Sequence, residues 1–521
     1  MGNSTMTTSK KRCVLALDQG TTSSRAILFD STGQPLATQQ ESFPQHVRTM
    51  ETEADGGGVD QAIVEHDPED LWKTQLGCAS RCLSEAGVRA DQVAAIGITN
   101  QRETTVLWDR ATGKPVAPAI VWQSRVSAPI CERLKEDGLE DEVRQRTGLL
   151  LDPYFSATKI MHLFETHAGL RERCEAGEVL FGTVDSFLIW RLTGGRVHAT
   201  DVTNASRTLL FDIITGDWSD ELLKIFNIPR AMLPRVRPSS GIFGEIDEGW
   251  LGAPIPIAGC AGDQQSSAFA HGCDKAGDAK TTYGTGAFLL ESTGTTPVLN
   301  AEGLLATPAC TRESDPAPQS YCLEGSVFVA GALVGWLRDG LGIIERSSDI
   351  EPLARSVPDS GGVVIVPALA GLGTPHWDPI ARGLIVGLTR STEKSHIARA
   401  ALNAIALSVA EVLGCLAASS GHRLPRLRVD GGACVNDLLM QTQADVLGVP
   451  IDRPAVLETT ALGAGLLAGL ATGFYQSTAS ISDARGIEKT FYPQADAKER
   501  HQQLDHWRDA VSRCRGWARP S

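Results

Sequence analysis

Four short segments of the chain combine carboxylates, hydroxyls and glycines in patterns that could hold a phosphate and a polyol. They are 18–24 (DQGTTSS), 99–104 (TNQRET), 262–265 (GDQQ) and 282–288 (TYGTGAF). Glycine lets the backbone approach an anion, and successive N–H groups with neighbouring hydroxyls form an anion-binding nest. An acid beside such a turn can hold the magnesium ion of a nucleotide. Together the four segments predict a kinase that acts on a sugar alcohol.

The most informative pair in these segments is Arg102 and Glu103. A small polyol offers mainly hydroxyls, so a selective site must supply donors and acceptors together. Arginine presents a rigid fork of donors and a carboxylate accepts from neighbouring hydroxyls. The pair follows an apolar segment, 93–99, which is typical of a strand, and α/β proteins bind ligands at the carboxyl ends of their strands. Without that strand, an Arg-Glu dipeptide is more often an exposed surface pair.

The elements that must position these segments repeat along the chain. Strands are predicted at 12–17, 25–30 and 35–40, with a phosphate turn after the first of them. A second strand, 280–283, leads into Gly284, Thr285 and Gly286 in the same way. Two strand-and-loop units predict two related α/β domains around one nucleotide.

Later segments predict the elements of the second unit. A long packed helix is expected over 396–418, because its apolar residues recur at helical spacing without a proline. A strand is expected at 427–430 and a helix from Asn436 onward. The segment 458–470 has glycine and alanine at close intervals, which permits close helix packing. The stretch 47–61, with three consecutive glycines, reads as a flexible surface loop.

Composition limits the possible partners and compartment. The 521 residues exceed the roughly 250–300 that one core usually serves, which favours two large domains. A net charge of −14 argues against nucleic acid and against an anionic membrane as main partners. Twelve cysteines without a CxxC pair are typical of a reducing compartment, so we expect a cytoplasmic protein. The polar first eleven residues indicate a disordered tail rather than a signal peptide.

Several strings in order, among them DQGTTSSRA, AAIGITNQRET, DPYFS, TNASRT, AGDQQ, TYGTG, VDGGA and TALGAG, extend this pattern over most of the chain. In these strings the chain resembles the FGGY carbohydrate kinases of the actin-like ATPase superfamily, and within them the branch that phosphorylates glycerol. The resemblance implies an α/β fold of two ribonuclease-H-like domains flanking a nucleotide and substrate cleft. The implied division is a tail (1–11), an N-terminal domain (12–270), a C-terminal domain (271–495) and a helical tail (496–521).

The same resemblance implies ATP-dependent phosphorylation of glycerol to sn-glycerol 3-phosphate. Asp263 would accept the proton of the attacking hydroxyl and orient it in line with the γ-phosphate. The residues that would hold glycerol are Arg102, Glu103, Tyr154, Asp263, Gln264, Phe288 and Trp122. For either aromatic wall, core packing is the alternative interpretation.

For the nucleotide, the resemblance implies two phosphate loops, a position for adenine and a magnesium ion bound with ATP. The nucleotide residues would be Thr21, Thr22, Ser23, Arg25, Thr285, Gly331, Gly432 and Asn436. Asp18 and Asp263 would hold the magnesium. The chain contains no GxxxxGK[ST] string, which excludes a P-loop mechanism.

Two alternatives remain open at this point. One is a kinase of the same family acting on another polyol or on a ketose such as xylulose or ribulose. The other is a nucleotide-dependent interaction module that phosphorylates no small molecule, although a paired polyol motif would have no purpose there. A homodimer or homotetramer is expected from family habit. Bacterial relatives bind fructose bisphosphate through an arginine before Ile255, but no Lys or Arg lies between Arg237 and Lys275, so we expect no such regulation.

Overall fold

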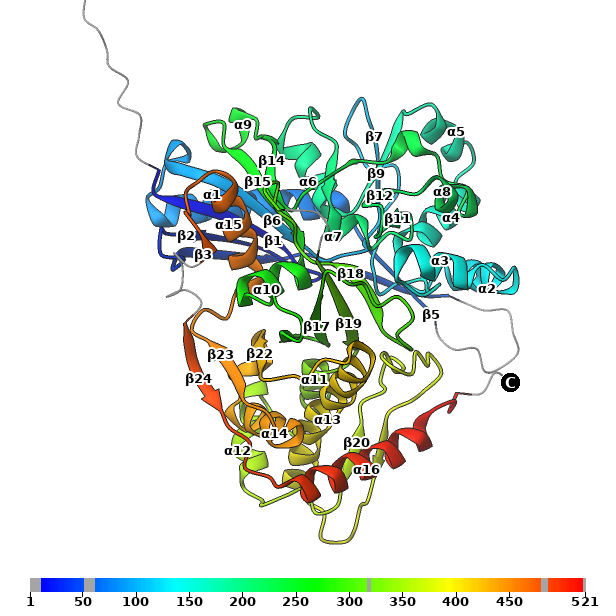
Figure 1. Ribbon diagram of the computed structural model, residues 1–521, viewed down its shortest axis with the longest axis vertical. Helices are drawn as coiled ribbons and strands as arrows, with labels where there is room; N and C mark the ends of the chain where they lie inside the picture. Colours follow the sequence, from blue (N-terminus) through cyan, green and yellow to red (C-terminus); the bar gives the residue numbers. More distant parts are fainter. Residues whose placement is uncertain (1–10, 51–60, 316–319, 479–485, 519–521) are drawn as a thin grey trace, which may run out of the picture.

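The computed structural model describes residues 11–50, 61–315, 320–478 and 486–518. The predicted disordered tail therefore lies outside the described residues except for Lys11. Two mixed sheets form the centre of the molecule, one from each half of the chain (Figure 1).

The central strands of the N-terminal sheet, β1, β6 and β15, are apolar and almost fully buried, whereas the edge strand β3 is largely exposed. The strand order of the sheet is β14-β15-β6-β1-β2-β3. β1, β2 and β3 form an antiparallel meander, β6 and β15 join in parallel, and β14 is antiparallel to β15. The strands are β1 (Cys13–Gln19), β2 (Ser23–Phe29), β3 (Pro35–Ser42), β6 (Val93–Asn100), β14 (Ser240–Glu245) and β15 (Pro256–Gly262).

The C-terminal sheet repeats this plan. Its order is β18-β19-β17-β16-β22-β23-β24, again with an antiparallel meander, two parallel strands and an antiparallel edge. The strands are β16 (Ala279–Tyr283), β17 (Ala287–Gly294), β18 (Leu305–Pro308), β19 (Tyr321–Val327), β22 (Leu427–Asp430), β23 (Ile451–Pro454) and β24 (Ile487–Phe491). The prediction of two related units from the two strand-and-loop segments is confirmed by this shared topology.

Helices cover both sheets and fill the segment between β6 and β14. α1 (Pro68–Ala86) packs on β2 and β3, and α13 (Lys394–Ser420) packs on β17 and β19. The inserted segment contains β7 (Val106–Asp109), β9 (Val179–Gly182), α2 (Ala128–Glu136), α3 (Glu140–Thr147), α4 (Ser156–Thr166), α5 (Leu170–Glu175), α6 (Val184–Leu192), α7 (Val202–Ala205) and α8 (Asp220–Ile225). Four further helices are α9 (Glu248–Leu251), α11 (Gly331–Asp339), α12 (Ile350–Arg355) and α14 (Asp437–Leu447).

α13 is long and apolar enough to cross a membrane, with a mean hydropathy of 1.8. Most of its apolar stretch is buried within the protein, so it is the core helix of the C-terminal sheet. The expected helical tail is α16 (Ala497–Cys514), which packs against α14 and the small sheet β20 (Val364–Val366) and β21 (Leu384–Val386). Its buried Trp507 and Val511 attach it to the C-terminal half.

Two helices join the halves. α10 (Asp263–His271) contacts strands of both sheets, and α15 (Thr459–Ala471) packs beside it on the N-terminal sheet (Figure 1). The approach is close enough to require glycine, because a Cβ at Gly463 would lie 2.0 Å from the Ser266 carbonyl oxygen. The predicted close helix packing of 458–470 is therefore confirmed, with α10 as the helix partner and the N-terminal sheet as a second partner.

The loop predicted over 47–61 extends too far at both ends, because strands occupy residues 46–50 and 61–66. Residues 46–50 form β4 (His46–Met50), which pairs antiparallel with β5 (Gln61–His66), and β5 continues to β8 (Ala119–Ile120). Val47 lies opposite Val64 in this ladder, and such cross-strand apolar pairs stabilise a hairpin. Residues 51–60, which include the glycine run, lie outside the described residues.

Candidate functional site

Arg102 is the centre of a buried ion-pair network that links the two halves of the chain. It lies in the loop directly after β6 and is 3 % exposed. Its Nη1 and Nη2 donate to the two carboxylate oxygens of Glu324 on β19, at 2.6 and 2.8 Å. Its Nε lies 3.1 Å from Asp263 Oδ1, and Nη1 also donates to Gln265 Oε1 at 3.2 Å. The guanidinium orientation is therefore fixed from both domains.

Arg207 closes the network on the other side. Its Nε donates to Glu103 Oε1 at 2.5 Å and its Nη2 donates to Glu324 Oε1 at 3.1 Å. Burial alone would raise the pKa of Glu324, but Arg102 and Arg207 outweigh it and lower that pKa to about 2. Burial raises the pKa of Glu103 against the opposing effect of the same arginines. Charges buried this deeply require mutual pairing, so each of the four residues depends on the others.

Sequence reasoning missed both Arg207 and Glu324. Arg207 lies within the TNASRT string, to which no chemical role was assigned. Glu324 is the one acid in an otherwise apolar or small-residue strand, Tyr321–Val327. A charged side chain in a strand that is buried at every position must find a partner, and that was the available signal.

Three predicted aromatic residues lie together beside this network. The Trp122 ring lies 5.6 Å from Tyr154 and 6.0 Å from Phe288, each at 82° to it. Trp122 Nε1 donates to Thr21 Oγ1 at 3.0 Å, which connects the aromatic group to the first phosphate loop. The Arg207 guanidinium lies 5.6 Å from the centre of the Tyr154 ring. Burial raises the pKa of Tyr154, so its phenol stays protonated and can donate.

Several polar atoms of these residues remain available to a ligand. Within the described part of the chain, Glu103 Oε2, Tyr154 Oη and Gln264 Nε2 make no hydrogen bond. Gln264 is held from the other side, because the buried Lys280 donates to its Oε1. Lys280 Nζ also donates to Thr282 Oγ1 at 2.7 Å. The arrangement offers one acceptor and two donors, which is the mixture that a polyol needs.

Asp263 is the most accessible charged group of the site. Its side chain is 31 % exposed, whereas those of Arg102 and Glu324 are at most 2 % exposed. It is the first residue of α10, and its Oδ1 accepts from the Gln264 backbone N–H at 2.7 Å. The preceding Gly262 has no room for a side chain, since a Cβ there would lie 2.6 Å from Arg102 Cδ. The sequence thus places a partly exposed carboxylate next to the fixed arginine.

The predicted first phosphate loop corresponds to the short turn between β1 and β2, with Thr21, Thr22 and Ser23. The Gly20 backbone N–H donates to the Ser23 carbonyl at 3.0 Å and tightens the turn. Arg25, on β2, donates to Glu458 immediately before α15 and to Gln40 Oε1 at 3.1 Å. Because Glu458 precedes a helix of the C-terminal half, this loop too is connected across the molecule.

Asp18, near the end of β1, has the chemistry and surroundings of a residue that could bind magnesium. Its carboxylate makes no hydrogen bond within the described residues, and the nearest cation is Arg25 Nη1 at 3.9 Å. Burial raises the pKa of Asp18 to about 7, assisted by the negative charges of Glu458 and Asp263 and opposed by Arg25. A divalent cation would relieve this unfavourable charge, and carboxylate oxygens are the ligands that magnesium prefers.

The predicted second phosphate loop lies between β16 and β17 and contacts the start of α11. The Thr285 carbonyl accepts from the Ala330 and Ala332 N–H groups at 2.8 and 3.0 Å, and the Gly331 N–H donates to the Gly284 carbonyl at 3.0 Å. The predicted residues Thr285 and Gly331 are therefore neighbours. Both Gly284 and Thr285 are exposed.

The predicted adenine residues adjoin this loop. Gly431 has φ +86°, and a Cβ there would lie 2.6 Å from the Tyr283 carbonyl oxygen, directly before the loop. The exposed Gly432 follows, with open space where its side chain would be. Asn436 caps α14 through Oδ1, which accepts from the Leu439 N–H at 2.9 Å. Its amide nitrogen remains available within the described residues.

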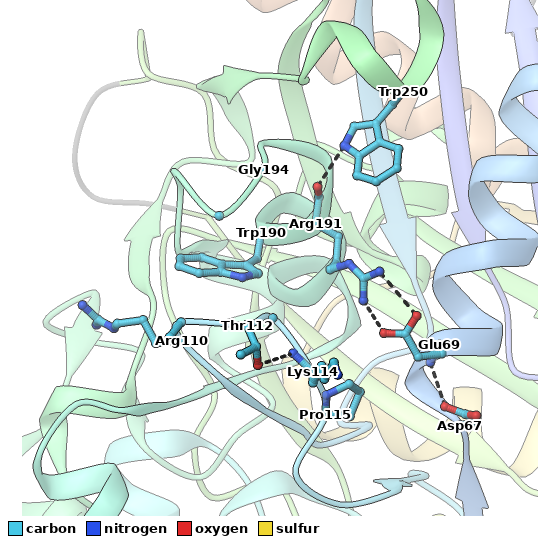
Figure 2. A pocket seen from close by; sticks show the side chains of 13 residues that line it. Asp67, Glu69, Arg110, Thr112, Lys114, Pro115, Trp190, Arg191, Gly194 and Trp250 are labelled. Carbon is cyan, nitrogen blue, oxygen red and sulfur yellow. Dashed lines mark hydrogen bonds and ion pairs between the residues drawn. The ribbon is translucent and has the colours of Figure 1, made fainter.

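A cavity of about 850 Å³ lies on the N-terminal half but contains none of the predicted site residues (Figure 2). Several of the groups that line it already have partners. Arg191 pairs with Glu69 and lies 4.9 Å from the centre of the Trp72 ring, while Trp250 Nε1 donates to the Arg191 carbonyl at 3.2 Å. We assign it no chemistry.

A second cluster of possible metal ligands, Asp185, Asp201 and Cys260, is also satisfied internally. Its ligand atoms lie within 4.8 Å of one another. Asp185 accepts from Thr183 and Thr200 at 2.5 and 2.7 Å, and the Asp201 side chain caps α7. Burial raises the pKa of Asp185 to about 6. The carboxylates of this cluster are therefore already hydrogen-bonded within the protein, and we assign it no metal ion.

The chain is similar to known kinases over nearly its whole length. The N-terminal domain of the FGGY family of carbohydrate kinases matches residues 13–270, and the C-terminal domain of that family matches residues 279–472. A glycerol kinase of Ralstonia nicotianae is 52 % identical over 502 residues, which is 96 % of this chain and 98 % of that protein. A glycerol kinase of Deinococcus radiodurans is 52 % identical over 509 residues, covering 98 % and 99 %.

Solved structures agree with these matches. A crystal structure of Plasmodium falciparum glycerol kinase with ADP is 33 % identical, with a TM-score of 0.87 over 97 % of this chain and 99 % of that one. A xylulose kinase of Lactobacillus acidophilus shares the fold, at 21 % identity and a TM-score of 0.78 over 96 % of each chain. The two domain matches, the close relatives and the repeated sheets lead to one conclusion: the chain belongs to the FGGY family of carbohydrate kinases.

Proposed function

We propose that this kinase transfers the γ-phosphate of ATP to a terminal hydroxyl of glycerol, giving sn-glycerol 3-phosphate. The observation that carries the proposal is the fixed Arg102 and Glu103 pair beside Asp263 and an aromatic group. Relatives that are 52 % identical over almost the whole chain bear the name glycerol kinase, which supports the same substrate.

Glycerol would be held by the groups that the buried network leaves available. Glu103 Oε2 accepts from one hydroxyl, while Arg102, the Tyr154 phenol and the Gln264 amide donate to hydroxyl oxygens. Phe288 and Trp122 pack against the carbon atoms and leave little room for a longer sugar. The Arg102 guanidinium cannot turn away, because Glu324 holds it through two hydrogen bonds.

Asp263 would act on the attacking hydroxyl. Phosphoryl transfer has a loose transition state, so orienting the hydroxyl in line with the phosphate matters more than removing its proton early. The Asp263 carboxylate accepts that proton as the new bond forms. Its partial exposure leaves it accessible to substrate, and Arg102 Nε at 3.1 Å stabilises its negative charge.

ATP would bind across the two phosphate loops. Thr21, Thr22, Ser23 and Arg25 contact the phosphates from one side and Thr285 from the other, with Gly331 at its flank. Adenine lies near Gly432 and Asn436. Asp18 and Asp263 hold a magnesium ion, which neutralises developing phosphate charge when it is bound.

The remaining features of the proposal concern the whole molecule. We retain the division into an N-terminal domain (12–270), a C-terminal domain (271–495) and a C-terminal helical segment (496–521). A cytoplasmic homodimer or homotetramer, without nucleic acid or membrane partners and without regulation by fructose bisphosphate, completes the proposal. The fructose bisphosphate part would be contradicted by dose-dependent inhibition at millimolar effector.

The decisive experiment is coupled release of ADP by the purified protein with magnesium ATP. The substrate panel is glycerol, dihydroxyacetone, glyceraldehyde, xylulose, ribulose and gluconate. A strong preference for glycerol supports the proposal. Turnover only with a ketose or gluconate would retain the family and reject the substrate, whereas slow ATP hydrolysis indifferent to every polyol would favour an interaction module.

A further inference from the structure

Glu103 adopts a backbone conformation that L-residues avoid. Its φ is +61°, in the left-handed region where the Cβ crowds the backbone. The strain lies at a residue that the proposed function places against glycerol, and such strain persists only where surrounding contacts hold it. The contacts that hold it are therefore part of the construction of the polyol site.

The Glu103 carbonyl accepts from several side chains at once. Lys159 Nζ donates at 3.1 Å and Ser156 Oγ donates at 3.0 Å. Both donors lie on α4, three residues apart and hence on the same face of the helix. A third donor, Thr105 Oγ1, lies at 3.3 Å. Two residues of one helix thus fix the peptide that carries the Glu103 carboxylate.

Lys159 also holds a second polyol segment. Its Nζ donates to the Tyr154 carbonyl at 2.7 Å, so one ammonium group joins the backbones of Glu103 and Tyr154. Glu103 and Tyr154 are far apart in sequence, and the described residues provide no direct hydrogen bond between them. The ammonium therefore sets the spacing between an acceptor and a donor for the substrate.

The position of this lysine is unfavourable for a purely structural residue. Lys159 is 0 % exposed and forms no ion pair with any carboxylate in the described ranges. Burial lowers its pKa to about 7, although the charges of Glu103, Asp152 and Cys131 act in the opposite direction. An apolar side chain would fill the same space without the desolvation cost of an ammonium group.

We propose that Lys159 is a positioning residue that sets the geometry of Glu103 and Tyr154 for polyol binding. The inference rests on the proposed function, because it assigns these two residues to the substrate. Lys159 acts through their backbones and does not itself contact the substrate. Its loss therefore alters recognition of the polyol and leaves the nucleotide loops unaffected.

The test uses the full chain with Lys159→Met, Ser156→Ala and a matched control, Thr158→Val. Thr158 is also fully buried on α4, but its hydroxyl lies 2.9 Å from Ser127 Oγ, away from both polyol segments. Steady-state KM values for glycerol and for ATP are measured for each variant, together with the melting temperature.

For Lys159→Met we expect the glycerol KM to rise roughly tenfold, because two buried carbonyls lose a charged donor. The ATP KM should stay within about twofold. Ser156→Ala should shift the glycerol KM in the same direction by about threefold, since it removes one neutral donor. Thr158→Val should change neither KM even where its melting temperature falls.

A glycerol KM for Lys159→Met within about twofold of wild type would overturn the proposal. A parallel rise of both KM values that Thr158→Val also shows would overturn it equally, since that pattern follows general loosening of α4. If Lys159→Met does not fold, Ser156→Ala decides, and an unchanged glycerol KM rejects the inference. Failure of the proposed function is distinguishable, because there the wild-type protein itself would not phosphorylate glycerol.

Discussion

The proposed polyol side and the proposed nucleotide side of this site are built in different ways. The polyol side consists of charged side chains, buried and paired with one another across the two domains, with Arg102 and Glu324 as the central pair. The nucleotide side consists of short turns, in which Thr22, Gly284, Thr285 and Gly432 are exposed. The groups proposed to bind the polyol are thus pre-organised before any ligand binds, whereas the proposed phosphate loops offer backbone N–H groups that a ligand must engage.

Asp263 lies where the two sides meet, so its replacement should produce the largest effect. We expect Asp263→Asn to lower kcat about 10³-fold, within the range for loss of a positioned general base. ADP binding by calorimetry should remain within a few-fold of wild type. Loss of both kcat and ADP affinity would instead indicate misfolding or a dominant metal-binding function for this carboxylate.

Glu324→Gln should affect the polyol side alone. The change leaves Arg102 and Arg207 without their shared charge partner, and breaking a buried pair typically costs about 3–5 kcal/mol. We expect kcat/KM for glycerol to fall roughly 100-fold, with a lower melting temperature and a nearly unchanged ATP KM.

Glu291→Gln is the matched control for that variant. Glu291 is also buried, on the neighbouring strand β17, but it lies 3.4 Å from His422 and outside the network. Equal losses of glycerol kcat/KM in both variants would show that buried charge in this sheet matters only for stability.

Arg25→Gln should affect the nucleotide side alone and more weakly. Arg25 is partly exposed and paired with Glu458, so part of its charge is already compensated. We expect the ATP KM to rise about tenfold, because one charge-assisted contact to phosphate is lost. The glycerol KM, measured at saturating ATP, should not change. A rise in the glycerol KM alone would show that Arg25 belongs to the polyol side rather than to the nucleotide side.

Asp185→Asn should leave activity unchanged and alter only the pH dependence of stability. The folded pKa of about 6 lies above the ordinary value of 3.8, so wild-type stability falls as pH rises through that interval. Near pH 7, removing the charge should stabilise the variant relative to wild type by up to roughly 3 kcal/mol, reduced by the hydrogen bonds that it loses. Near pH 4 we expect no such stabilisation, because Asp185 is already protonated there. Melting temperatures across that range provide the measurement, and a difference independent of pH would contradict it.

Local pattern predicted much of the fold and most of the groups gathered at the site. The strand before Arg102, the turns after β1 and β16 and the helix over 394–420 all follow from short-range spacing. The role of Glu324 could not be predicted from local pattern, because its partner Arg102 lies 222 positions earlier and meets it only through the packing of two domains. Lys159 was missed for a similar reason, since its function depends on the unusual φ of Glu103, which no sequence pattern reveals.

The family resemblance also supplied assignments that the geometry alone would not have suggested. Residues such as Gly331 and Gly432 have no side-chain chemistry, and their assignment to the nucleotide stays a prediction. The loop expected over 47–61 was wrong at its ends because the central glycines dominated the pattern and concealed the pairing of β4 with β5.

The attachment of α15 to the N-terminal sheet has a consequence for biosynthesis. In the N-terminal sheet, Val14, Ile27 and Phe29 pack against Leu462 and Leu466 of α15. The helix is synthesised about 200 residues after Gly262, the last strand residue of that sheet. At about 5–20 residues per second, the nascent N-terminal half waits roughly 10–40 s with one apolar sheet face uncovered. We therefore expect the soluble yield of this protein to depend on synthesis rate and chaperone supply, although its final form buries that face.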